Sequence, residues 1–241
     1  MMKLGRFEAV RAAAILFAVA PLGSPAAAQQ LDEAAIIRMV DANVQKRVAQ
    51  VASFTDIERY QVYRGDEQTH PAATMTARDS YTRGVGKTYA ILAQSGSALV
   101  QKFGLHPLLD NEEKINQPEN VPHSWFTSAN YKMKLKPGGP QRVNGRMCYA
   151  LAIAPKQNAP NMIDGTLWVD AKDGSIVKVD GVASKSPSPF AGATHMMRDY
   201  TEIDGFPMAT HARAESKSWL FGRTVVLIDY SDYHLHVQKG R

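Results

Sequence analysis

The sequence predicts an α+β protein that is mainly antiparallel β, with one long helix preceding the strands. Two observations predict this class. Short runs rich in Tyr, Thr, Val and Ile alternate with glycine-bearing turns over most of the chain. A stretch with apolar residues every three or four positions stands before the first of these runs.

The first 28 residues have the pattern of a cleavable export signal. Lys3, Arg6 and Arg11 make a positive segment, residues 12–20 are apolar, and a run of alanines ends at Ala28, after which we expect cleavage. The alternative, a membrane anchor, needs about 18 apolar residues, which is roughly twice this run. No cysteine follows the expected cleavage site, so nothing in the sequence indicates that this protein is itself lipidated. We therefore expect a soluble periplasmic protein.

Residues 32–51 are predicted to form the long helix. Asp32 has a side chain suited to capping its start. The apolar residues recur at spacings of three and four and give the helix one face to bury: Ile37, Val40, Val44, Val48 and Val51.

Three strands and a break in the sheet are predicted next. Residues 54–63, 73–85 and 87–94 are rich in strand-forming residues and are separated by glycines, which indicates a meander. Residues 97–128 change from helical apolar spacing to a polar, proline-bearing stretch. We expect one or two short helices and a loop there, forming a lid.

Seven further strands complete the predicted sheet. Turn dipeptides such as Asn144-Gly145 and Asp204-Gly205 suit tight hairpins, so strands that follow one another should pair in antiparallel fashion. The predicted strands are residues 130–136, 146–154, 165–170, 175–182, 194–203, 206–219 and 223–234.

The strand at residues 146–154 bears on function. Met147, Tyr149, Leu151 and Ile153 point to one side, and Cys148 and small alanines point to the other, so both faces are apolar. Either the sheet packs on helices and has a partly buried back, or a curved sheet holds an apolar ligand on its concave side.

Charge and cysteine content argue against a nucleic acid partner and against an intrachain disulfide. The formal net charge is +5, and because residues 1–28 hold three basic residues and one acidic residue, +3 remains beyond them. The basic residues are scattered rather than gathered in an arm, so no nucleic acid partner is expected. Cys148 is the single cysteine, so it has no partner for an intrachain disulfide, and we expect it to be a buried, inert thiol.

Several hairpin motifs carry a resemblance to a known family. They are VNGRMCYAL at 143–151, GTLWVD at 165–170, DGSIVKV at 173–179 and YTEIDGFPM at 200–208. With them, the sequence resembles the outer-membrane lipoprotein-sorting proteins of the LolA/LolB type. The resemblance implies one domain over residues 29–241, an incomplete, half-open β-barrel closed by helices, with a cavity that accepts acyl chains.

The resemblance also implies a function. The chain would be a monomeric periplasmic carrier, not an enzyme, that takes acylated lipoprotein or lipid towards the outer membrane and docks on an inner-membrane export complex. Two alternatives stay open: a lipid- or lipoprotein-sensing module of the same fold, and a periplasmic enzyme with titratable groups converging in the cavity. The expected cavity-lining residues are Tyr60, Val62, Tyr149, Leu151, Trp168, Met208 and Val226.

Arg83 is the candidate for a latch. In LolA-type carriers an arginine on an early strand holds the helical lid closed through hydrogen bonds to backbone. Arg83 in Tyr81-Thr82-Arg83-Gly84 matches that arginine, although glycine replaces the proline that usually follows.

Neither a metal nor a cofactor is expected from the sequence. His234 and His236 alternate on one strand face but lack a third ligand at useful spacing. No G-x-S-x-G motif provides a hydrolase nucleophile.

Overall fold

The computed structural model describes residues 32–159, 162–185, 192–218 and 222–238. The chain divides into two units, Met1–Gln30 and Leu31–Arg241, and all described residues belong to the second. The predicted export signal, residues 1–28, lies outside the described residues. No helix in the described residues is long and apolar enough to cross a membrane.

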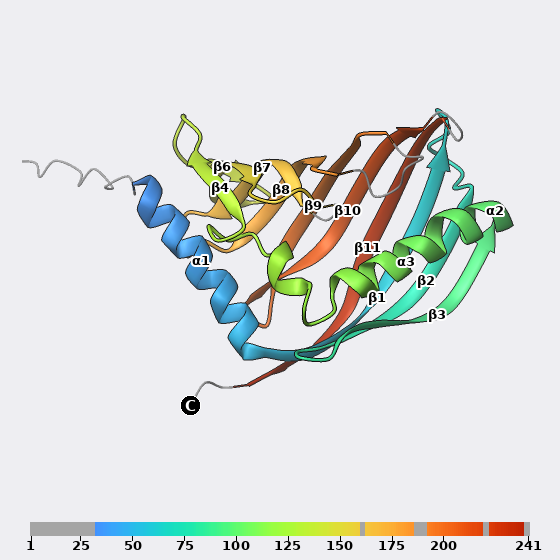
Figure 1. Cartoon of the computed structure of the whole chain (residues 1–241), viewed down its shortest axis with the longest axis horizontal. Helices are drawn as coiled ribbons and strands as arrows, with labels where there is room; N and C mark the ends of the chain where they lie inside the picture. The colour runs from blue at the N-terminus through green and yellow to red at the C-terminus, as the bar shows by residue number, and fades with distance from the viewer. Residues whose placement is uncertain (1–31, 160–161, 186–191, 219–221, 239–241) are drawn as a thin grey trace, which may run out of the picture. The chain divides into compact units, whose positions relative to one another are not determined.

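Eleven strands form one open, antiparallel sheet (Figure 1). Their spatial order is β3-β2-β1-β11-β10-β9-β8-β7-β6-β4, and β5 also pairs with β6. The strands are β1 (Val51–Arg64), β2 (Ala73–Thr82), β3 (Gly86–Gly96), β4 (Tyr131–Leu135), β5 (Gln141–Val143), β6 (Arg146–Pro155), β7 (Ile163–Asp170), β8 (Ile176–Ala183), β9 (Thr194–Ile203), β10 (Phe206–Ser218) and β11 (Gly222–Val237).

The predicted antiparallel meander is confirmed. All ten predicted strands are present, and consecutive strands from β6 to β11 are neighbours. Asn144 and Asp204 have φ of 46° and 51°, and the glycines that follow them also have positive φ, as two-residue hairpin turns require. The short β5 was not predicted. The longest-range pairing joins β1 to β11, from Val51 opposite Val237 to Arg64 opposite Thr224.

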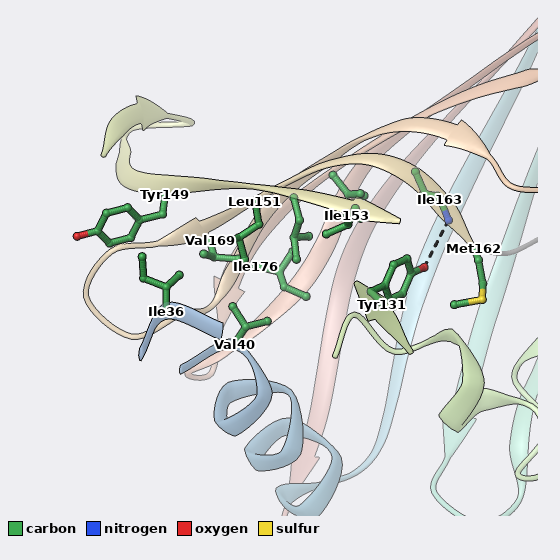
Figure 2. Packing of buried hydrophobic residues seen from close by; sticks show 12 residues of the cluster. Ile36, Val40, Tyr131, Tyr149, Leu151, Ile153, Met162, Ile163, Val169 and Ile176 are labelled. Atoms are coloured by element: carbon green, nitrogen blue, oxygen red, sulfur yellow. Dashed lines mark hydrogen bonds between the residues drawn. The ribbon is translucent and has the colours of Figure 1, made fainter. Parts of the chain in front are cut away.

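Helix α1 (Glu33–Gln50) packs over the β6–β9 part of the sheet. Asp32 caps it as predicted, because its Oδ1 accepts a hydrogen bond of 2.6 Å from the Ala35 N–H. Ile36 and Val40 are buried in a cluster with Leu151 and its neighbours on β6, β7 and β8 (Figure 2). The burial of this face, and not helix propensity alone, fixes α1 on the sheet.

A second helical segment crosses the β1–β3 part of the sheet. It consists of α2 (Ala98–Val100), the π-helical η1 (Gln101–Leu105) and α3 (His106–Ile115), and the 3₁₀ turn η2 (Val121–Ser124) follows. Leu105 and Leu109 pack against a smaller buried cluster that contains Tyr60 and Met75. The predicted helices within residues 97–128 are therefore confirmed, and they lie on the same face of the sheet as α1 (Figure 1).

The two faces of β6 match the sequence expectation in part. Tyr149, Leu151 and Ile153 are buried beneath α1, as one side of an alternating strand should be. On the other side Cys148 is buried, but Ala152 is exposed. Met147, expected on the same side as Tyr149, is 47% exposed, because it lies at the start of the strand. Ala150 and Ala154 are half-buried, so the back of β6 is partly buried, as the first of the two alternatives expects.

Candidate functional site

Two adjoining cavities lie between the sheet and the helical segments. The first, the polar cavity, has a volume of about 310 Å³ and reaches from α1 to α3 across β1, β2, β9 and β11. The second, the apolar groove, has a volume of about 190 Å³ and lies between the residue 99–108 segment and β1 and β11. Leu108 of α3 lines both, so the two spaces meet at its side chain.

The polar cavity is lined by an unusual number of ionisable groups for an interior space. A cavity built only for acyl chains would avoid them, because burying a charge without a partner costs several kcal/mol, on the order of the stability of a whole domain. These groups are Arg47, Asp56, Glu58, Asp79, Lys87, Glu112, Arg198, Tyr200, Tyr230 and Tyr233.

A buried ionic network lies on β1, β2 and β3, at one side of this cavity. The Lys87 ammonium lies 2.9 Å from Glu58 and 3.1 Å from Asp79, and it stands 4.7 Å from the centre of the Tyr89 ring. The Tyr60 hydroxyl donates to Glu58. The strand register explains the arrangement, since Asp56 faces Asp79 across the β1–β2 pair and Tyr89 faces Asp79 across the β2–β3 pair.

The network holds more carboxylates than it can neutralise. Burial, followed by the neighbouring Asp79 and Glu58 charges, raises the pKa of Asp56 to about 8. Burial also raises the pKa of Asp79 to about 6, against the opposing effect of Lys87. Neither carboxylate oxygen of Asp56 has a hydrogen-bond partner within the described residues. Asp56 therefore keeps its proton at neutral pH.

The three carboxylates have a spacing that a metal ion could use. One oxygen each from Asp56, Glu58 and Asp79 lies within 4.8 Å of the others. The Lys87 ammonium already forms ion pairs with two of them, Glu58 and Asp79. The protein itself therefore provides the positive charge that the cluster needs. Within the described residues this is the one grouping of three such ligands, and His234 and His236 are not part of it.

Two arginines line the same cavity. Arg47 lies in the last turn of α1, and Arg198 lies on β9. Burial lowers the pKa of Arg47, whereas the neighbouring Tyr230 and then Tyr200 raise the pKa of Arg198. Both guanidinium groups stay charged, since arginine is not deprotonated in proteins.

The apolar groove has few polar atoms and two strongly exposed apolar side chains. Leu99 is 66% exposed and Phe103 is 61% exposed, although both stand beside buried leucines of the same segment. Val62 and Val226 form the floor from β1 and β11, where they are opposite each other in the strand pairing. A groove that ends in exposed apolar residues is typical of a binding surface.

The predicted cavity residues fall in four different places. Val62 and Val226 line the apolar groove, and Met208 lines the polar cavity. Tyr60, Tyr149 and Leu151 are buried in the two core clusters. Trp168 lies between the buried Leu167 and Val169 on β7, so its side chain points to the opposite face of the sheet, beside Lys178. Their role as ligand-binding residues stays a prediction.

Arg83 lies just beyond β2 and contacts the end of α1. Its Nη1 donates to the carbonyl of Val48 at 2.9 Å and to that of Ala49, and its Nη2 donates to Gln238 Oε1 at 2.5 Å. A cation at the carboxyl end of a helix is favourable, because the last carbonyls there lack partners within the helix. Arg83 thus makes the backbone contacts that a latch needs, but to α1 and not to residues 97–128.

Sequence reasoning missed the ionic network and the arginine pair. Asp56 and Glu58 alternate along β1, a pattern that reads as the solvent face of a strand. Lys87, which pairs with Glu58, stands 29 positions from it, so only the β1–β2–β3 pairing brings the two together. Cys148 is buried as predicted, and burial raises the pKa of its thiol to about 11, which leaves it protonated and unreactive.

The protein is thus an open antiparallel sheet that carries helical segments and two cavities on one face. Solved structures with a similar fold include a LolA superfamily protein from Nitrosomonas europaea, at 13% identity and a TM-score of 0.46, covering 86% of this chain and 94% of that one. A DUF1329 family protein from Desulfovibrio piger matches at 15% identity and a TM-score of 0.45, with the same coverage of both chains.

A putative outer membrane lipoprotein-sorting protein domain from Vibrio parahaemolyticus matches at 13% identity and a TM-score of 0.45, covering 77% of this chain and 86% of that one. The family that the hairpin motifs resemble is thus represented among these structures. No protein-family model and no curated protein matches the sequence.

Proposed function

We propose that this chain is a periplasmic lipid-binding carrier that holds an acyl chain in the apolar groove. The observation that carries the proposal is the groove itself, an apolar space between a helical segment and the sheet with Leu99 and Phe103 exposed at it. Burying each methylene contributes about 0.8 kcal/mol, so six methylenes contribute about 5 kcal/mol. An alkyl chain in the groove would also remove Leu99 and Phe103 from water.

The finer parts of the proposal follow the family resemblance. Residues 97–128 act as a lid that, with α1, closes the open side of the half-barrel, and Arg83 acts as a latch by holding the end of α1. The cargo is an acylated lipoprotein or a lipid, delivered towards the outer membrane by a monomer that receives it from an inner-membrane export complex. Export by residues 1–28 would bring the chain to the periplasm.

Binding of the uncharged fluorescent probe N-phenyl-1-naphthylamine tests the groove. Leu99→Asp places a charge in it at an exposed position, so the fold is expected to survive. Val85→Asp is the matched control, because Val85 is 67% exposed and does not line the groove. We expect the wild type and Val85→Asp to bind the probe alike and Leu99→Asp to bind at least about tenfold more weakly. Equal binding by both variants would overturn the proposal.

A further inference from the structure

Arg47 and Arg198 line the polar cavity without a carboxylate partner. Neither forms a salt bridge in the described part of the chain. The Nε atom of Arg47 is buried and has no hydrogen-bond partner there, and one Nη contacts only the Met208 sulfur, at 3.7 Å. A buried N–H donor without an acceptor destabilises the folded protein unless a bound group accepts its hydrogen bond.

Both arginines lie near Tyr200, which interacts electrostatically with each of them. Tyr200 also lines the cavity, so Arg47, Arg198 and Tyr200 all contribute to the wall of the same space. Arginine presents a planar set of N–H donors that matches the oxygens of a carboxylate or a phosphate. Two such groups around one cavity are a donor set for an oxyanion.

The acidic groups of the cavity do not neutralise these arginines. Glu58 and Asp79 pair with Lys87, and Asp56 is protonated at neutral pH. Glu112 on α3 contributes a more distant charge that favours the charged form of Arg198. The carboxylates of the ionic network therefore lie with Lys87 on β1, β2 and β3, whereas the two arginines lie on α1 and β9.

The polar cavity and the apolar groove follow one another along the same two strands. On β11, Val226 lines the groove, and Tyr230 and Tyr233 line the cavity. On β1, Val62 lines the groove, and Glu58 lines the cavity. An apolar space thus continues into a charged one with Leu108 at the junction, which matches the polarity of an amphiphile from tail to head.

We propose that the polar cavity binds the oxyanionic head of a single-chain amphiphile through Arg47 and Arg198, while the chain of that amphiphile occupies the apolar groove. The proposal rests on the proposed function, because it uses the groove as the site of the chain. It adds a selectivity, since an uncharged lipid of the same length gains nothing from the arginines.

Calorimetric titration of the full chain with three probes separates the possible sources of binding. The probes are dodecanoate below its micellar concentration, 1-dodecanol and inorganic phosphate. We expect dodecanoate to bind at least about tenfold more tightly than dodecanol, since hydrogen bonds to a charged group contribute a factor of that order. Phosphate alone should not bind or displace dodecanoate at millimolar concentration.

The variants Arg47→Gln and Arg198→Gln test the assignment of the residues. Each should lose about tenfold in dodecanoate affinity and leave dodecanol affinity unchanged. Arg38→Gln is the control, because Arg38 is an exposed arginine on the same helix as Arg47 and does not line the cavity. Circular dichroism and thermal unfolding would identify a variant that fails to fold, and the remaining arginine variant then decides.

The outcomes distinguish the two proposals. Equal affinities for dodecanoate and dodecanol, or arginine variants that behave as Arg38→Gln does, would overturn the head-group site and leave the groove standing. Phosphate that competes as well as dodecanoate would also overturn it, because the cavity would then hold a free anion. No binding of either alkyl probe would overturn the proposed function.

Discussion

The two ends of the helix-bearing face are built on different principles. Under α1, the buried cluster around Leu151 contains twelve residues, of which ten are aliphatic residues or methionine and two are tyrosines. Under the segment from α2 to α3, the corresponding cluster has seven buried residues and is followed by the apolar groove and then by the ionic network. The first end is a packed apolar core, and the second holds the apolar groove and the buried charged groups of the ionic network.

The apolar groove, where we propose that the acyl chain binds, therefore lies away from the larger buried cluster. Leu99 is exposed, and the Arg47 Nε and the Asp56 carboxyl have no hydrogen-bond partner among the described residues. Each of these features costs stability in the free protein. Natural proteins keep such features mainly where function uses them. Variants that affect one end and not the other therefore test the contrast directly.

Removing the cation of the ionic network has the largest expected effect. Lys87→Met leaves Glu58 and Asp79 buried without their partner, so we expect a loss of about 3–5 kcal/mol in the free energy of unfolding, measured by urea denaturation. Lys132→Met, at an exposed position of β4, should change it by less than about 0.5 kcal/mol. A small effect of Lys87→Met would contradict a structured network under α3.

Truncating the core under α1 has the next largest effect. Leu151 is fully buried, so Leu151→Ala should cost about 3 kcal/mol through lost burial and the cavity left behind. Binding of N-phenyl-1-naphthylamine per folded molecule should stay at the wild-type level, because Leu151 does not line the groove. A loss of probe binding without unfolding would show that the two ends are not separate.

The carboxyl pair of the network makes stability depend on pH. A carboxyl group whose folded pKa is raised, as in Asp56 and Asp79, contributes stability that is present below its unfolded pKa and is lost as the pH rises through its folded pKa. The free energy of unfolding should therefore fall between pH 5 and pH 8. Asp56→Asn should flatten this slope. An identical slope in the variant would contradict the raised pKa of Asp56.

The cap of α1 gives the smallest predicted effect. Asp32→Ala removes the acceptor for the Ala35 N–H and should cost about 1 kcal/mol, seen as a lower midpoint in thermal unfolding. Asp32→Asn keeps an acceptor and should cost only a few tenths of that amount. Equal losses in both variants would point to the charge of Asp32 and not to its hydrogen bond.

Much of the fold could be predicted from the sequence because its signals are local. Strand alternation and the Asn144-Gly145 and Asp204-Gly205 turns are set by neighbouring residues, and Asp32 marks the start of α1. The three-residue β5 could not be predicted, because such a short strand gains its stability from pairing with β6.

The candidate site depends on contacts between distant residues and was therefore less predictable. The sequence predicts Val62 and Val226 as apolar strand residues, and they meet in the groove because β1 pairs with β11. Trp168 is also an apolar strand residue, but its neighbours Leu167 and Val169 are the residues of β7 that point to the buried face. Trp168 therefore points to the other face. Arg47 lies on the predicted helix, but the apolar spacing of that helix does not indicate that Arg47 lines a cavity together with Arg198 of β9.

Native mass spectrometry with lipid extraction, on the protein expressed as the full chain and purified from the periplasm of its own host, tests the carrier proposal most directly. We expect an acyl-bearing species bound at one per chain in the wild type and in Val85→Asp, and absent in Leu99→Asp. A wild-type protein that carries no acyl-bearing species would contradict a lipid-binding role for the groove.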